Sequence, residues 1–124
     1  MKIIMIGPSL SGKGGITSVV NTYLSNPDFQ KNVKYIGTNT EKRVFCKALL
    51  FFFSIAKLII YNIIIRYRIV HIHCASKTSF YRKSLFLLLA KIFAKITILH
   101  IHSGDFHKFY YNSGNFKKKY IRYI

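Results

Sequence analysis

The chain has 124 residues, which is enough for one folded domain and too few for two of ordinary size. Its hydrophobic content of 51% excludes an intrinsically disordered chain, because disorder requires low hydrophobicity. Twenty lysines and arginines oppose three acidic residues, and the net charge of +17 favours a polyanionic partner such as nucleic acid, an anionic lipid surface or a phosphorylated ligand.

Short apolar runs alternate with longer helical patterns along the chain. In chain order the sequence predicts a strand at 2–6, a glycine-rich loop at 11–15, a helix at 16–24, a strand at 33–37, a long helix at 45–66, a strand at 69–73, a helix at 80–95, a strand at 96–102, a loop or short helix at 104–111 and a basic segment of undecided form at 115–124. The Asn26-Pro27-Asp28 motif is predicted to end the first helix. This alternation indicates an α/β fold, with a Rossmann-like parallel sheet, right-handed crossovers and helices on both faces.

The long helix predicted at 45–66 raises the question of a membrane. Within it, residues 48–65 carry only the charge of Lys57, and this length approaches what a bilayer-spanning helix needs. Lys57 lies in the middle of the segment and Asn62 follows, and both side chains are costly in hydrocarbon. The polar side chains form a narrow stripe, namely Lys47, Ser54, Lys57 and Tyr61. We therefore expect a helix packed on the sheet or lying on a membrane surface, with a spanning helix as the alternative.

The two cysteines, Cys46 and Cys74, form no CxxC pair. We interpret them as reduced, buried thiols of a cytosolic protein.

Residues 7–14, which include most of the glycine-rich loop, nearly match the motif of a phosphate-binding P-loop. Its last position should carry a magnesium-binding hydroxyl but is Gly14, and Thr17 breaks the dinucleotide-binding fingerprint. A glycine-rich turn between a strand and a helix remains, and its backbone N–H groups suit a diphosphate. Gly14 and Gly15 are therefore candidate ligands, and a tight turn that needs a positive φ is the simpler alternative.

Four histidines alternate on two predicted strands, His71 with His73 and His100 with His102. Parallel α/β sheets bind ligands at the carboxyl ends of their strands. His73 and His102 lie where a strand opens into a loop and are the stronger functional candidates. His71 and His100 lie deeper in their strands and suit a structural role equally well.

A zinc site is the alternative interpretation of the histidines. It would combine three or four of them with Cys74 or Asp105. The sequence contains no close metal-ligand spacing of this kind, and we expect no bound metal.

Three motifs in order resemble the N-terminal domain of family 4 glycosyltransferases, and together they cover nearly the whole chain. They are Ile3-Ile4-Met5-Ile6-Gly7-Pro8 with Gly14-Gly15-Ile16, then Ile69-Val70-His71-Ile72-His73 followed by Ser79-Phe80-Tyr81-Arg82-Lys83-Ser84, and finally His100-Ile101-His102-Ser103-Gly104-Asp105-Phe106-His107-Lys108-Phe109-Tyr110. The last segment is the most specific and is similar to bacterial polysaccharide-assembly members, although Ser103 stands where that family usually has glycine.

The resemblance implies the N-terminal half of a two-domain GT-B fold, with the active site between the domains. The implied reaction is a retaining transfer of a hexose from a nucleotide-sugar donor to a lipid-linked saccharide acceptor, without a further cofactor. His102 would be the catalytic residue beside the transferred sugar. The positions expected to bind the donor diphosphate or the substrates are Gly14, Gly15, His73, Ser103, Gly104 and Asp105.

In this family a second domain holds the nucleotide. We therefore expect residues 1–124 to be an acceptor-side domain, incomplete at its C-terminal end, without the nucleotide-sugar domain and inactive alone. The expected location is cytoplasmic, peripheral at the inner face of the cell membrane, with an anionic membrane surface as partner and no nucleic acid. The +17 charge and 16% aromatic content leave a basic nucleic-acid-binding module as one alternative. A non-catalytic, membrane-associated remnant of a transferase is the other.

Overall fold

A computed structural model describes residues 2–39, 44–94 and 96–124 of the chain. In this part of the chain, four strands form one sheet in the order β2-β1-β3-β4. They are β1 (Ile3–Gly7), β2 (Val33–Gly37), β3 (Ile69–Cys74) and β4 (Ile96–Ile101). All pairings are parallel, and Met5 on β1 lies between Tyr35 on β2 and His71 on β3. The expected α/β class with a parallel sheet is confirmed.

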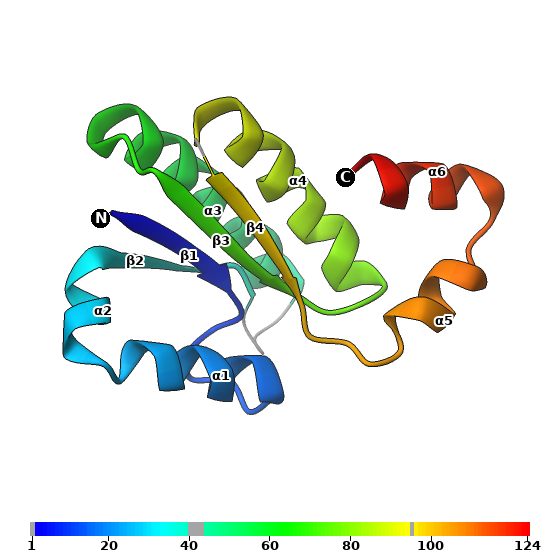
Figure 1. Cartoon of the computed structure of the whole chain (residues 1–124), viewed down its shortest axis with the longest axis horizontal. Helices are drawn as coiled ribbons and strands as arrows, with labels where there is room; N and C mark the ends of the chain where they lie inside the picture. The colour runs from blue at the N-terminus through cyan, green and yellow to red at the C-terminus, as the bar shows by residue number, and fades with distance from the viewer. Residues whose placement is uncertain (1, 40–43, 95) are drawn as a thin grey trace.

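Helices cover both faces of the sheet, as expected (Figure 1). They are α1 (Gly15–Leu24), α2 (Pro27–Asn32), α3 (Val44–Ile65), α4 (Thr78–Phe93), α5 (Phe106–Tyr111) and α6 (Asn115–Tyr123). Helices α1 and α2 lie on one face, and α3 and α4 on the other. Beyond β4 the chain continues into α5 and α6, and α6 returns to α4 through a hydrogen bond between the Tyr120 and Ser84 hydroxyls of 2.6 Å. The arrangement is Rossmann-like, and its place in a two-domain enzyme stays a prediction.

Alternating side chains on the strands build two apolar layers. The larger layer lies under α3 and α4 and contains Ile4, Ile6, Ile36, Leu58, Tyr67, Val70, Ile72, Phe86, Leu87 and Ala90. The smaller layer lies under α1 and is formed by Met5, Val20 and Val33. The smaller layer is centred on β1 and β2. On the same face, Ile96 and Ile98 of β4 remain 51% and 43% exposed. This part of the sheet face is therefore open.

The structure adds to or adjusts three expectations about local structure. The first helix ends at Leu24, before the Asn26-Pro27-Asp28 motif, as expected. The motif also starts an unpredicted helix, α2, because the Asn26 side chain accepts hydrogen bonds from the Asp28 and Phe29 N–H groups at 3.0 and 3.1 Å. The basic segment at 115–124 forms helix α6 over nearly its whole length. The helix expected at 80–95 begins earlier, at Thr78, and ends at Phe93; its expected last residue, 95, lies outside the described residues.

Helix α3 buries two polar side chains against the sheet together with an apolar one and leaves many large apolar side chains exposed. Its buried residues are Ser54, Leu58 and Asn62. The Ser54 hydroxyl donates to the Gly37 carbonyl at 2.9 Å, and this bond fixes the helix to the end of β2. Lys57 is exposed, so the expected stripe of polar side chains does not lie in a single environment.

The outer side of α3 carries many large apolar side chains, namely Val44, Phe45, Leu49, Phe52, Phe53, Ile60, Ile63 and Ile64. The helix is long and apolar enough to cross a membrane, with a mean hydropathy of 2.3, and only 17% of that window is buried. We call this set of side chains the outer face of α3.

Candidate functional site

The loops that follow β1, β3 and β4 lie together at the carboxyl edge of the sheet (Figure 1). In parallel α/β sheets this edge is where ligands bind. Four of the seven expected site residues lie in these loops, namely Gly14, Ser103, Gly104 and Asp105. Gly15 is the first residue of α1, His73 lies near the end of β3 and His102 directly follows β4.

The glycine loop borders a cavity of about 330 Å³. Its lining consists of Pro8, Ser9, Gly12, Lys13, Gly14, Gly15, Ile16, Thr17 and Asn39. Gly14 is the N-terminal cap of α1 and offers no side-chain cap, so the first N–H groups of the helix remain available to an anion. A Cβ atom added at Gly14 or Gly15 would meet nothing within 4 Å. These glycines leave the backbone accessible.

The alternative that Gly14 serves a turn with positive φ is wrong. Gly14 has φ 165° and ψ 159°, which is extended backbone open to any residue. Gly7, at the end of β1, does have a steric requirement, because a Cβ there would overlap the Tyr35 hydroxyl. That hydroxyl donates to the Pro8 carbonyl at 2.5 Å and holds the start of the loop.

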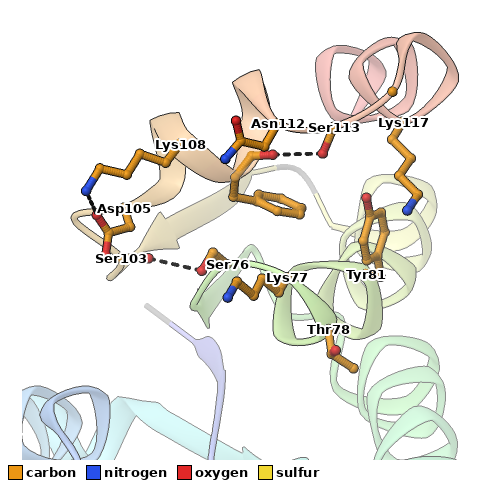
Figure 2. A pocket seen from close by; sticks show the side chains of 12 residues that line it. Ser76, Lys77, Thr78, Tyr81, Ser103, Asp105, Lys108, Asn112, Ser113 and Lys117 are labelled. Atoms are coloured by element: carbon orange, nitrogen blue, oxygen red, sulfur yellow. Dashed lines mark hydrogen bonds and ion pairs between the residues drawn. The ribbon is translucent and has the colours of Figure 1, made fainter.

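A second cavity, of about 630 Å³, lies between the loop after β3, the loop after β4 and helices α5 and α6 (Figure 2). We call it the lysine pocket. Its lining consists of Ser76, Lys77, Thr78, Tyr81, Ser103, Asp105, Lys108, Phe109, Asn112, Ser113, Gly114 and Lys117. Two of the expected site residues, Ser103 and Asp105, belong to it, together with three lysines from three different parts of the chain.

Hydrogen bonds shape the mouth of the lysine pocket. The Ser103 hydroxyl donates to the Ser76 hydroxyl at 3.2 Å and so joins the loops after β3 and β4. Asp105 pairs with Lys108 at 2.9 Å, and because both side chains are largely exposed this pair contributes little to stability. Figure 2 shows Lys117 extending from the α6 side toward Tyr81. No acidic side chain of the pocket lining pairs with Lys77 or Lys117 in the described structure. Both lysines therefore add unpaired positive charge to the pocket.

Helix α4 begins at the lysine pocket. Its N-terminal cap is Lys77, which has a positive φ of 58° and makes no side-chain cap bond. The first N–H groups of this helix thus lie beside lysine side chains, an arrangement that favours phosphate or carboxylate groups. Ser76, Lys77 and Lys117 were not predicted from the sequence as site residues. One sequence signal could have identified Ser76 and Lys77: a hydroxyl and a lysine stand between the end of a strand and the start of a helix.

The four histidines of β3 and β4 form one cluster on the face of the sheet that carries α1. His73 and His100 are register partners, and the rings of His100 and His102 stack with centroids 3.9 Å apart. His73 Nδ1 and His102 Nε2 are 2.7 Å apart and share a hydrogen bond. Tyr23 of α1 contacts the rings of His71 and His73 at one side of the cluster. The two strands therefore place together four side chains that the sequence shows only as two separate pairs.

Burial controls the protonation of this cluster. Desolvation, with smaller effects from neighbouring imidazoles, lowers the pKa of His73 to about 3 and that of His71 to about 4. The pKa of His102 is lowered as well, first by burial and then by His100. These three side chains are consequently neutral at neutral pH and can each accept one hydrogen bond or bind one cation.

The structure does not assemble the zinc ligand set considered from the sequence. Cys74 is buried, and strand alternation turns it to the face opposite His73. Asp105 lies in the loop after β4 and pairs with Lys108. The interpretation of both cysteines as buried thiols is also wrong for Cys46, which is exposed on α3.

A buried lysine for which the sequence predicted no role lies behind the glycine loop. Lys83 of α4 is 3% exposed, and its ammonium donates to the Gly7 carbonyl at 3.1 Å and to the Thr38 hydroxyl. Burial lowers its pKa to about 7. Next to it, Arg82 donates to the Asn39 side chain at 3.2 Å. Lys83 thus ties α4 to the carboxyl ends of β1 and β2.

The expected site residues therefore fall into three neighbouring places. Gly14 and Gly15 line the cavity of the glycine loop, His73 and His102 belong to the histidine cluster, and Ser103 and Asp105 line the lysine pocket. Gly104 is exposed and lines neither cavity.

Comparison of the chain with family models, with curated proteins and with solved structures gives no match in any of the three.

Proposed function

We propose that this chain is the acceptor-side domain of a retaining GT-B glycosyltransferase working at the inner face of the cell membrane. The observation that carries the proposal is the lysine pocket. It lies at the carboxyl edge of the parallel sheet and is formed in part by the segment, 100–110, that most resembles the bacterial polysaccharide-assembly enzymes.

The chemistry of the lysine pocket suits a lipid-linked saccharide. Lys77, Lys108 and Lys117, together with the first N–H groups of α4, favour the phosphates that join the saccharide to its lipid. The hydroxyl and amide groups of Ser76, Thr78, Ser103, Asn112 and Ser113 match the hydroxyls of a sugar. A volume of about 630 Å³ is in the range of sites for small-molecule ligands.

The donor would approach from the glycine loop. Its accessible N–H groups at the start of α1 would contact the diphosphate of the nucleotide sugar, and a second domain, as in the family, would hold the nucleotide. His102, between the glycine loop and the lysine pocket in this proposal, would hydrogen-bond the transferred hexose and orient it.

Membrane attachment in this proposal uses the outer face of α3. Exposed apolar side chains on one helix and a net charge of +17 together favour the surface of a bilayer that contains anionic lipids. A transferase attached there meets a lipid-linked acceptor within the plane of the membrane.

Equilibrium binding to nanodiscs tests the proposal. We expect the chain to bind anionic nanodiscs carrying a polyprenyl-diphosphate-linked saccharide more tightly than the same nanodiscs without it. Lys77→Gln with Lys117→Gln should remove most of this difference, because both lysines line the pocket. Lys2→Gln with Lys34→Gln is the matched control, since it removes equal charge from exposed lysines elsewhere. No added affinity for the saccharide lipid, or tighter binding to an oligonucleotide than to any nanodisc, would contradict the proposal.

A further inference from the structure

Three histidine side chains approach one another on the open part of the sheet face. His71 and His73 are alternate residues of β3, and His100 lies opposite His73 on β4. One ring nitrogen from each lies within 4.8 Å of those of the other two. Tetrahedral zinc at ~2.1 Å from each nitrogen would hold them about 3.4 Å apart. Small rotations of the half-buried rings of His71 and His100 would bring the three nitrogens to that spacing.

The central histidine of the three has an unused nitrogen. His73 is fully buried, and its Nε2 has no hydrogen-bond partner among the described residues. A buried polar atom without a partner is costly, so this nitrogen points to a missing ligand. The other ring nitrogen, Nδ1, shares a hydrogen bond with His102 Nε2 at 2.7 Å. When Nδ1–H is the donor, Nε2 keeps a free lone pair. Histidines that bind metals in proteins commonly have this arrangement.

We propose that His71, His73 and His100 bind a divalent transition metal ion of the zinc class, and that His102 orients His73 for it. Neutral imidazole nitrogen is a preferred ligand of zinc, copper, nickel and cobalt. Three protein ligands leave a coordination position for water or a substrate, and the exposure of Ile96 and Ile98 keeps that side of the sheet open. The inference goes beyond the proposed function and does not depend on it.

The sequence predicted no metal because no ligands lie at the close spacing that marks a metal site along the chain. The three histidines belong to two strands, and their approach depends on the parallel register that places His73 opposite His100. This register cannot be read from the residues of either strand alone.

The net charge of the chain determines how salt should change its affinity for the metal ion. Three neutral ligands supply no negative charge, and the dication enters a chain with a net charge of +17. Repulsion therefore weakens binding, and a non-coordinating salt that screens the repulsion should strengthen it. Loose association with phosphate-like impurities or with exposed carboxylates would weaken with salt.

The experiment uses the untagged chain with Cys46→Ser, which removes the exposed thiol. Zn²⁺ is titrated in competition with a chromophoric chelator, and Co²⁺ reports the ligands by its absorption spectrum. We expect one ion per chain and a Co²⁺ spectrum without a thiolate band. His73→Ala should lower Zn²⁺ affinity by more than 100-fold, beyond the effect of losing an orienting partner. His107→Ala is the matched control, because His107 is exposed on α5 and should not affect affinity.

Two variants of His102 test its orienting role. His102→Gln keeps a hydrogen-bond acceptor for His73 Nδ1, and we expect near-parental Zn²⁺ affinity. His102→Leu removes the acceptor and should lower affinity by about 10–100-fold. Equal losses in both variants would contradict the orienting role.

A measurement on the unsubstituted histidines guards against variants that fail to fold. Imidazole ¹⁵N resonances of the Cys46→Ser chain should show a Zn²⁺-dependent shift of His73 Nε2. No shift at His73, or Zn²⁺ binding that survives replacement of all three histidines, would overturn the proposal.

Discussion

Lys83 is a charged side chain placed where water cannot reach it. Its ammonium donates to the Gly7 carbonyl and the Thr38 hydroxyl, but burial still lowers its pKa to about 7, from an ordinary value near 10.5. Its two neutral acceptors lie at the ends of β1 and β2, so the lysine connects α4 to the carboxyl edge of the sheet. Lys83 lines neither of the two cavities, so its role is structural.

The depressed pKa of Lys83 has a consequence for stability. Between pH 7 and about pH 10 the unfolded chain keeps the lysine proton while the folded chain has lost it, so stability rises with pH in this window. Lys83→Met removes the titrating group and should remove this rise. Urea unfolding of both proteins at pH 7 and pH 9.5 measures it, with Lys34→Met, an exposed lysine, as the control. Identical changes in unfolding free energy with pH for parent and Lys83→Met would show that Lys83 is not desolvated as described.

Individual residues show which features of the candidate site could be predicted from the sequence and which could not. Gly14 and Gly15 were predicted to bind a diphosphate through their backbone; both have open space where a Cβ would lie, and the binding itself stays a prediction. The hydrogen bond between His73 and His102 was not predicted, because the two residues lie 29 positions apart and meet only through the pairing of β3 with β4.

At the scale of elements, α3 is unusual in which side chains it buries and which it exposes. It faces the sheet through Ser54, Leu58 and Asn62 and leaves most of its large apolar side chains outside. The Ser54 hydroxyl lies within donor distance of the Gly37 carbonyl of β2 and of the Leu50 carbonyl of its own helix, between which its single proton is shared. The Asn62 amide N–H donates to the Leu58 carbonyl within the helix. Such a helix leaves a wide apolar surface, which marks a membrane or protein contact.

We expect the outer face of α3 to control adsorption to lipid. Phe52→Ser, Phe53→Ser and Ile60→Ser combined should weaken binding to anionic vesicles by at least tenfold, since each buried apolar side chain is worth about 1.5–3 kcal/mol. Ile92→Ser, Phe116→Ser and Tyr123→Ser combined remove large apolar side chains from α4 and α6 that are even more exposed, and this control should have a smaller effect. Vesicle co-sedimentation measures both. For the parental chain, added salt should weaken binding, and equal, salt-independent binding to neutral and anionic vesicles would indicate a spanning helix or aggregation instead.

The elements themselves were largely predictable, because period-two and period-3.6 patterns mark the strands and longer helices. Helix α2 was missed because Pro27 was interpreted only as a stop, although proline also suits the first turn of a helix. The orientation of α3 was not predictable from the rule that polar side chains face water. The Gly37 carbonyl that accepts the Ser54 hydroxyl comes from another element.

At the scale of the whole molecule, the carboxyl edge of the sheet gathers residues that the sequence spreads over a hundred positions. The edge itself was predictable, since every parallel strand opens into its loop there. The lysine pocket was not, because Lys77, Lys108 and Lys117 come from the loop after β3 and from α5 and α6, and their approach depends on how these helices return toward α4. The net charge of +17 was visible from the start, but the approach of these three lysines to one pocket was not.

Hydrogen exchange followed by mass spectrometry tests the central claim most directly. The full chain is compared on anionic nanodiscs with and without a polyprenyl-diphosphate-linked saccharide. We predict that any anionic nanodisc protects amides of α3, and that the saccharide lipid adds protection at residues 76–81 and 103–109, which contribute to the lysine pocket. A saccharide lipid that adds no protection to these two segments, or protects only α3, would contradict the assignment of this domain to acceptor binding.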